Sequence, residues 1–344
     1  MLMLVHYKCP NCGDDMAFDA DSGKLSCPSC GHGENIELLD EEYISREFSE
    51  DDAQEYHCKN CGAVVLTDKD TTATSCSFCG AGVVLADRLT NKLAPVKIIP
   101  FSISKELAQE SFKKWCKNGR FTPKGFMTAD RIKNITGIYV PFWIYDLHSD
   151  IHIRALGTRV KSYRRGDYVY VETKYYDVER EIVMYHEKVP ADASKKMDDS
   201  TMDLVEPYNY RDLKEFKMAY LTGFLAEKYN FTANDLLPRA KRKISRYINS
   251  YVNSTMRGYT SLSVKNKDIH TVQKKGSYVL FPLWMVYYDY EQQEHTFAMN
   301  GQTGKVVGTP PISKGKVVQW FAGLSASLFI LFKIIAFLIG GVWW

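Results

Sequence analysis

Cys9-Pro-Asn-Cys12 and Cys27-Pro-Ser-Cys30 stand near the start of the chain, and Cys58-Lys-Asn-Cys61 and Cys76-Ser-Phe-Cys79 follow them. Both halves have the spacing CxxC-x14-CxxC, and the second lies 49 residues after the first. Four thiolates presented as two pairs form a closed tetrahedral Zn²⁺ site that leaves no position for a substrate. A glycine follows every pair, as a turn with positive φ requires (Gly13, Gly31, Gly62, Gly80). The pattern predicts two structural zinc ions in two zinc ribbons, held by Cys9, Cys12, Cys27 and Cys30 and by Cys58, Cys61, Cys76 and Cys79.

Disulfide bonds are the alternative use of an even number of cysteines. Adjacent CxxC pairs make poor structural disulfides, and no signal-peptide pattern precedes Cys9. A redox CxxC is expected once rather than four times. Segments of this length bury too little apolar surface to fold alone, so we expect the zinc ions to fold them.

The far end of the chain is apolar. Residues 317–344 contain one charged side chain, Lys333, and are long enough to cross a hydrocarbon layer of about 30 Å as a helix. Trp320 lies near one end and Trp343 and Trp344 at the other, where interfacial anchors belong. A buried core helix is the alternative, but the stretch is apolar all round rather than on one face. We predict a single C-terminal transmembrane helix.

The orientation of this span follows from two independent signals. Lys314 and Lys316 precede it and no basic residue follows it, which favours a cytoplasmic N-terminal side. Zinc-binding thiols also require a reducing compartment. The predicted localisation is the cell membrane, with a single pass and the N-terminal bulk in the cytoplasm.

Lys333 lies near the middle of the span, where a charge is costly. At about 100° per residue it shares a helix face with small residues suited to close helix contact. That face predicts contact with a partner's transmembrane helix through Ala322, Ala326, Phe329, Lys333, Ala336 and Gly340. Simple snorkelling of the lysine towards the headgroups is the alternative.

Composition divides the chain into five parts: zinc ribbon 1 (1–36), an acidic linker (37–54), zinc ribbon 2 (55–90), an α+β domain (91–316) and the transmembrane helix (317–344). The formal net charge is +3 with neutral cysteines. Eight thiolates holding two Zn²⁺ would lower it to about −1. Bulk charge therefore does not indicate a nucleic-acid-binding protein.

Apolar periodicity gives the elements of the middle domain. It predicts helices over 104–118, 213–224 and 238–256, strands over 139–145 and 278–288, a hairpin over 151–189 that turns at 165–167, and a hairpin over 297–307. A helix followed by a Pro-x-Trp strand occurs twice, at 104–163 and 238–307, which suggests an internal duplication. The fold class expected is α+β with an antiparallel sheet.

The helix over 238–256 carries a basic cluster of Arg239, Lys241, Arg242, Lys243 and Arg246. A solvated helix face is the simplest interpretation. Contact with anionic lipid is the second interpretation, because each of the five cations would gain about 1 kcal/mol near an anionic bilayer. Contact with nucleic-acid phosphates is the third and the least favoured.

Several motifs together resemble a known family. They are the two cysteine frames, Pro95-Val-Lys-Ile-Ile-Pro-Phe101, Tyr139-Val-Pro-Phe-Trp143, Glu206-Pro-Tyr208 and Tyr220-Leu-Thr-Gly-Phe224. They look like bacterial membrane-anchored TFIIB-type zinc-ribbon proteins, which are also likened to the zinc region of the primosomal helicase. The resemblance implies a non-catalytic membrane protein associated with phage-shock-type envelope stress and with flotillin-like partners.

Signatures of enzymes are missing from the sequence. Gly301-Gln-Thr-Gly-Lys305 lacks the glycine spacing and the hydroxyl residue of a phosphate-binding loop, and the eight histidines form no HExxH motif. We therefore expect no small-molecule substrate. The function expected is that of an adaptor or assembly platform that recruits partner proteins to the membrane, and the alternative is a membrane-tethered nucleic-acid-binding protein.

Overall fold

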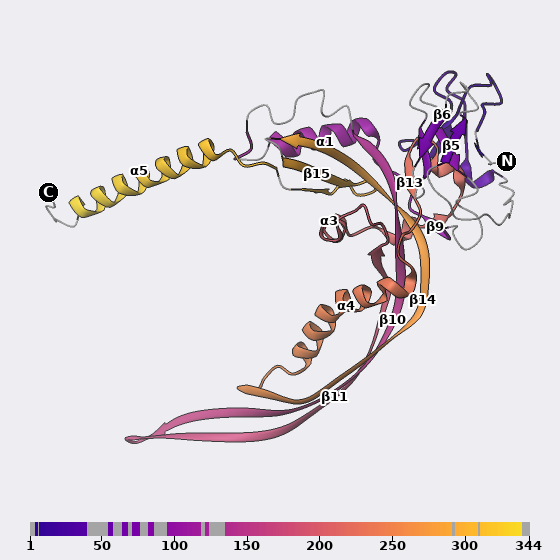
Figure 1. The fold of residues 1–344 in the computed structure, drawn as a ribbon. Coiled ribbons are helices and arrows are strands. Elements are labelled where there is room, and N and C mark those ends of the chain that lie inside the picture. The colour runs from indigo at the N-terminus through magenta and orange to yellow at the C-terminus, as the bar shows by residue number, and fades with distance from the viewer. Residues whose placement is uncertain are drawn as a thin grey trace.

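The computed structural model describes residues 4–5, 7–39, 54–57, 64–67, 71–75, 82–85, 95–117, 121–123, 135–290, 293–308 and 310–338. These residues form a mixed α+β structure built on one long, strongly curved sheet (Figure 1). The cysteine-bearing N-terminal segments lie at one end of the sheet and a long hairpin arm extends from the other. A C-terminal helix projects away from the body on the side to which the arm also points.

Three very long strands dominate the secondary structure, β10 (Thr136–Arg165), β11 (Tyr168–Asp192) and β14 (Ser261–Tyr290). The strands are β1 (Leu4–Val5), β2 (Ala17–Asp19), β3 (Lys24–Ser26), β4 (Gly33–Glu34), β5 (Gln54–His57), β6 (Val64–Thr67), β7 (Thr71–Ser75), β8 (Gly82–Leu85), β9 (Lys97–Ile98), β10 (Thr136–Arg165), β11 (Tyr168–Asp192), β12 (Lys214–Glu215), β13 (Leu225–Glu227), β14 (Ser261–Tyr290), β15 (Gln293–Asn300) and β16 (Val306–Val307). The helices are α1 (Lys105–Lys117), α3 (Asp199–Val205), α4 (Ala233–Thr255) and α5 (Lys314–Leu338), with short 3₁₀ turns η1 (Ile36–Leu38), η4 (Tyr210–Asp212) and η5 (Met218–Leu221).

β10 is the central strand of the sheet. It pairs with β11 on one side, as far as the turn at Gly166, and with β14 on the other, as far as Thr158 opposite Ser261. The predicted hairpin is therefore present, but its first strand is continuous with the predicted strand over 139–145. Pro141 does not interrupt the hydrogen bonds between β10 and its neighbours. Its carbonyl accepts from Ala193 N, just beyond the end of β11. The proline nitrogen, which has no hydrogen to donate, therefore faces the end of the β10–β11 ladder.

The pairing around β10 and β14 has an approximate twofold symmetry. Val140 lies opposite Phe281, and a Pro-x-Trp motif follows each of these two residues. The short parallel strands obey the same symmetry, because β9 pairs with β14 beside Leu280 while β13 pairs with β10 beside Tyr139. The sheet thus contains two equivalent units, β9-α1-β10-β11 and β13-α4-β14-β15. An origin by duplication stays a prediction.

The two tryptophans of these motifs secure the helices in equivalent ways. Trp143 Nε1 donates to Phe231 O, just before α4, over 2.9 Å. Trp284 Nε1 donates to Ile103 O, just before α1, over the same 2.9 Å. Each helix is therefore tied to the long strand of the other unit, and both tryptophans satisfy their single donor in a largely apolar environment.

α1 and α4 confirm two of the predicted helices, although α4 begins five residues earlier than periodicity indicated. Its first residue is set by a capping box between Thr232 and Asp235. One face of α4 is buried against β10 and β11 through Leu236, Ala240, Ile244, Ile248 and Val252. This stripe at helical spacing holds α4 on the concave side of the sheet (Figure 1).

The helix predicted over 213–224 is wrong. The segment contains β12 and the turn η5 instead, and Gly223 has a φ of +90°, which a helix does not accept. Its backbone bonds reach other elements, since Phe216 N donates to Val96 O and Thr222 O accepts from Phe18 N. Pairing with distant segments has replaced the local i→i−4 bonds.

The N-terminal segments are joined to this sheet. β7 pairs with β13, and β8 and β1 extend the sheet beyond β7. The predicted boundary between a second ribbon and the α+β domain therefore does not separate two independent sheets.

Candidate metal centre

Cys9, Cys12, Cys27 and Cys30 form a compact four-sulfur cluster. All four Sγ atoms lie within 4.8 Å of one another. Cys9 Sγ is 3.5 Å from Cys30 Sγ, and Cys12 Sγ is 3.5 Å from Cys27 Sγ. Zn–S bonds of about 2.3 Å at tetrahedral angles place sulfur atoms about 3.8 Å apart, so the cluster fits a zinc ion.

The backbone around the cluster has the turns that the sequence predicted. Gly13 and Gly31 have φ values of +76° and +74°, and each donates its N–H to the carbonyl of the first cysteine of its pair over 2.9 Å. The three-stranded sheet β2-β3-β4 supports the second pair. Each CxxC turn is therefore fixed by its own backbone hydrogen bonds. The conformation of the backbone, rather than the side-chain rotamers alone, brings the four thiols together.

One thiol of the cluster is acidic. Burial raises the pKa of Cys9, but the backbone N–H groups of Cys12 and Asn11 and hydrogen bonds from neighbouring thiols outweigh it and bring the pKa to about 6. Donors directed at sulfur stabilise the thiolate, which is the form that binds metal. Hydrogen bonds with the neighbouring thiols raise the pKa of Cys12 and of Cys30 in return, because the thiols of the cluster titrate together.

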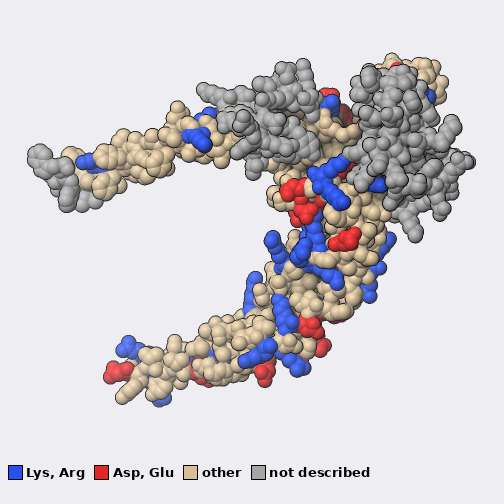
Figure 2. Space-filling model, in the orientation of Figure 1, with Lys and Arg blue, Asp and Glu red and all other residues tan. Residues whose placement is uncertain are grey.

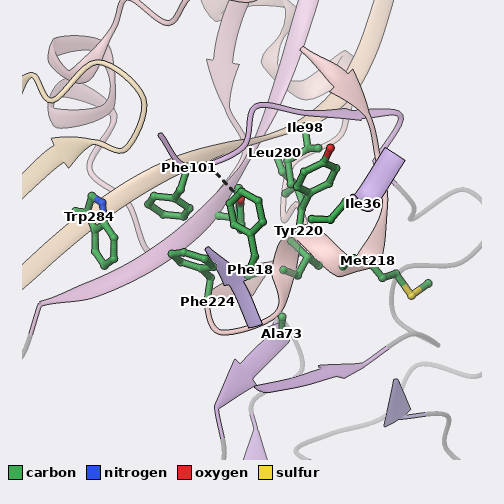
Figure 3. Packing of buried hydrophobic residues seen from close by; sticks show 14 of the residues in the cluster. Phe18, Ile36, Ala73, Ile98, Phe101, Met218, Tyr220, Phe224, Leu280 and Trp284 are labelled. Carbon is green, nitrogen blue, oxygen red and sulfur yellow. Dashed lines mark hydrogen bonds between the residues drawn. The ribbon is translucent and has the colours of Figure 1, made fainter. Parts of the chain in front are cut away.

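The first ribbon is packed into the body of the protein (Figure 3). Phe18 of β2 makes an edge-on contact with Tyr220 at a centroid distance of 5.5 Å and a tilted contact with Phe224 at 6.2 Å. Leu25 and Ile36 are fully buried in the same hydrophobic cluster. The ribbon therefore shares one core with the strands of the sheet.

Polar contacts reinforce this packing. Lys214 Nζ lies 2.6 Å from Glu37 Oε1, and Lys217 Nζ donates to Glu37 O and Leu39 O over 2.8 and 2.6 Å. The Lys214 ammonium, by hydrogen bonding and charge, lowers the pKa of the Glu37 carboxyl. The C-terminal end of the ribbon is thus attached to the segment that was expected to be a helix.

The second cysteine set lies outside the described residues. Cys58 and Cys61 stand in the chain between β5 and β6, which pair, and Cys76 and Cys79 between β7 and β8, which also pair. The second zinc ion therefore stays a prediction.

The four-sulfur geometry and the three short strands define a zinc-ribbon protein, and residues 7–48 match the TFIIB zinc-binding family. A relative of similar length exists: the chain is 59% identical over 339 residues to "Uncharacterized protein YdjG" of Bacillus subtilis (strain 168), covering 98% of this chain and 99% of YdjG. The chain therefore belongs to the YdjG family. No solved structure matches it.

The basic cluster of α4 is only partly available for contacts. Arg239 is 8% exposed, and its guanidinium donates to the carboxylates of Asp192, Asp199 and Asp203, the last two over 2.7 Å. Its proposed contact with lipid or nucleic acid is therefore wrong, because the side chain points into the protein. Arg239 lies three residues after Leu236, on the apolar side of the helix, and that spacing was the signal for its burial.

Lys243 is also engaged. Its Nζ lies 2.7 Å from Glu206 Oε1 and 2.8 Å from Asp203 Oδ1, and it donates to Pro190 O. The Lys243 ammonium is thus occupied by groups of the protein itself, and its contact with lipid or nucleic acid stays a prediction. Arg242 and Arg246 are exposed and Lys241 is half-buried, so these three remain as surface cations. Figure 2 shows Lys and Arg side chains along the concave side of the body, where α4 lies.

Two cations and four carboxylates meet in this cluster, which the sequence analysis missed. Burial raises the pKa of Asp192 to about 6 even though Arg239 opposes the shift. Burial likewise raises the pKa of Glu206 against the effect of Lys243. The cluster ties α3 and the end of β11 to α4.

α5 is the one helix among the described residues that is long and apolar enough to cross a membrane, and none of it is buried. Within it, Lys333 Nζ lies 5.7 Å from the centroid of the Phe329 ring. Ala322, Ala326 and Ala336 are also in α5, whereas Gly340 lies outside the described residues. None of the described residues buries the part of the predicted partner face that lies in α5.

Proposed function

We propose that the protein is a non-catalytic, membrane-anchored zinc-ribbon scaffold that holds partner proteins at the cytoplasmic face of the cell membrane. The observation that carries this proposal is the contrast between its two ends. One end is a metal-bearing module packed into a rigid sheet, and the other is an apolar helix with no buried surface.

The zinc centre supports a structural role. All four candidate ligands of the first ribbon are cysteines, so a bound zinc would have no open position for water or substrate. The ribbon shares its core with the sheet, so the metal would stabilise the whole body. We propose the same role for a second zinc ion at Cys58, Cys61, Cys76 and Cys79, supported by the equal spacing and the two paired hairpins around them.

The membrane anchor is supported by the start of α5. Trp320 contacts Phe121 with a ring-centroid distance of 6.3 Å, and Lys316 Nζ donates to Thr122 O over 2.6 Å. These contacts lie where a span would leave the body, at the level expected for interfacial tryptophan and basic residues. Lys314 and Lys316 favour a cytoplasmic body.

A nucleic-acid-binding function has less support. Arg239 and Lys243 neutralise carboxylates of the protein itself and are not available to phosphates. Three surface cations on α4 remain, and they suit a loosely held anionic lipid better than a nucleic-acid site.

The partners proposed are membrane proteins, of the flotillin-like or phage-shock type that the family resemblance implies. Lys333 with its small-residue face is the proposed contact within the bilayer. A partner with an acidic or polar group in its own span would satisfy the lysine charge.

The test is purification of the intact chain from membranes in mild detergent, with identification of the proteins that follow it. Wild type should retain at least one membrane protein that Lys333→Leu releases, while both variants stay in the membrane fraction. Ile334→Leu is the matched control and should retain the partner. Purification of the wild type alone, or in company with nucleic acid, would refute the scaffold.

A further inference from the structure

The far end of the hairpin arm exposes apolar side chains that nothing in the described structure covers. We define the arm tip as residues 159–175, beyond the last pairing of β14 with β10. Within it, Tyr168, Val169 and Tyr175 are 73%, 66% and 69% exposed. A two-stranded ribbon is only marginally stable in water alone. Such a tip is therefore expected to rest against another surface.

The arm tip is amphipathic. Opposite residues of an antiparallel pair share a face, and the register of β10 and β11 is unbroken along the tip. One face contains three valines and Tyr175, with Arg164 as its one charged residue; its members are Val160, Ser162, Arg164, Val169, Val171, Thr173 and Tyr175. The other face is basic and aromatic; its members are Arg159, Lys161, Tyr163, Arg165, Tyr168, Tyr170, Glu172 and Lys174.

The tip carries an excess of positive charge. Its basic residues are Arg159, Lys161, Arg164, Arg165 and Lys174, and its acidic residues are Asp167 and Glu172. On the basic face, Tyr163 stacks on Tyr170 at a centroid distance of 5.5 Å and an interplanar angle of 10°. Tyrosine at the headgroup level, cations towards anionic phosphates and valines towards the acyl chains are the composition of an interfacial membrane segment.

The direction of the arm points to the same surface. Figure 1 shows the arm and α5 projecting to the same side of the body, while the N-terminal segments lie on the opposite side. The start of α5 contacts residues 121–123: Ser313 N donates to Phe121 O, Lys316 Nζ donates to Thr122 O, and Trp320 lies against Phe121. A bilayer crossed by α5 would therefore lie on the side to which the tip extends.

We propose that the arm tip enters the interface of the membrane that α5 crosses, with Val169 and Val171 at the acyl boundary and the basic face among anionic headgroups. The protein is then held at two points, which fixes the orientation of its body. This inference rests on the proposed membrane anchor. Exposed cations of α4, on the concave side between the two attachments, add attraction to the same surface.

Photo-cross-linking of the full chain tests the proposal. Benzoylphenylalanine is placed at Val169 in protein reconstituted into phosphatidylcholine vesicles with or without phosphatidylglycerol. The matched control is Val183, which is 58% exposed on the same face of the same strand but nearer the body. A third position, Phe332 in α5, reports the anchor itself.

The expected result is lipid adducts at Val169 several-fold above those at Val183, rising with phosphatidylglycerol. Reversal of Arg164 and Arg165 to Glu should lower them. Lipid adducts at Phe332, together with yields at Val169 that are no higher than the background yields at Val183, would overturn the arm proposal. The proposed membrane anchor would then still hold. A chain-to-chain cross-link at Val169 would overturn it in favour of a second copy. Missing adducts at Phe332 would overturn the anchor and, with it, this inference.

Discussion

Replacement of Phe18 by Ala should destabilise the whole body and not only the ribbon. Phe18 is 5% exposed and belongs to β2, while its aromatic partners Tyr220 and Phe224 lie in the segment that leads into β13 of the main sheet. Buried Phe→Ala changes cost about 3–5 kcal/mol. With an m value of about 3 kcal/mol per molar urea, we expect the unfolding midpoint to fall by about 1 to 1.7 M.

Two signals separate the parts in one urea titration of the detergent-solubilised chain. Residues 1–90 contain no tryptophan, so tryptophan fluorescence follows the rest of the protein. A chromogenic chelator reports zinc release from the ribbon. Leu38→Ala, at an 80% exposed position just after the ribbon, is the control and should change stability by less than about 0.5 kcal/mol. A Phe18→Ala variant that releases zinc early with an unchanged fluorescence transition would show that the ribbon folds independently, against this reasoning.

Three further outcomes are expected. Arg239→Ala should cost about 3–5 kcal/mol in the same titration because it leaves the Asp192 carboxylate buried and unpaired, whereas exposed Arg242→Ala should be nearly neutral; equal effects would contradict the burial. Burial raises the pKa of Asp192 to about 6, above its value of about 3.9 in the unfolded chain, so the folded state binds the proton more tightly. The free energy of unfolding of the wild type should therefore fall relative to that of Asp192→Asn as the pH rises from about 4 to 6. A stability difference between the two proteins that does not change with pH would exclude the pKa shift. Cys27→Ser should remove one zinc ion per chain by elemental analysis, whereas Cys116→Ser, outside both sets, should remove none, and full zinc retention by the first variant would rule out the centre.

The features that sequence predicted well are local ones. Metal-ligand spacing fixed the first zinc site, because two CxxC turns with glycine at positive φ need only short-range geometry. The hairpin turn at Gly166 and the helix α1 followed from alternation and helical periodicity in the same way. Each of these signals is contained within a few tens of residues.

The features that it missed depend on contacts between distant parts of the chain. Phe18 packs on Phe224, more than two hundred residues away, and no local pattern marks that pairing. The segment around Tyr220 has helical spacing, but its apolar side chains serve contacts with the ribbon and the sheet. Tertiary pairing there outweighs a weak helical preference.

The basic cluster on α4 shows how charge counting can mislead. Arg239 and Lys243 stand among exposed cations in the sequence, yet they lie next to the buried stripe of Ala240 and Ile244. A cation at that position is buried and needs carboxylate partners, which arrive from α3 and the end of β11. Placing the charges on the helix face, rather than summing them, would have predicted that Arg239 is buried and that Lys243 is paired with carboxylates of the protein.

The symmetry of the sheet accounts for the two extensions on which the proposed membrane attachment depends. The two equivalent units each end in a hairpin, β10-β11 in the first and β14-β15 in the second. The first hairpin is lengthened into the arm, while the chain after the second continues through β16 into α5. Both extensions lie on one side and the zinc ribbon on the other, so the sheet separates them (Figure 1). In the proposed arrangement, two attachments on that side would turn the ribbon end towards the cytoplasm and the proposed partner proteins.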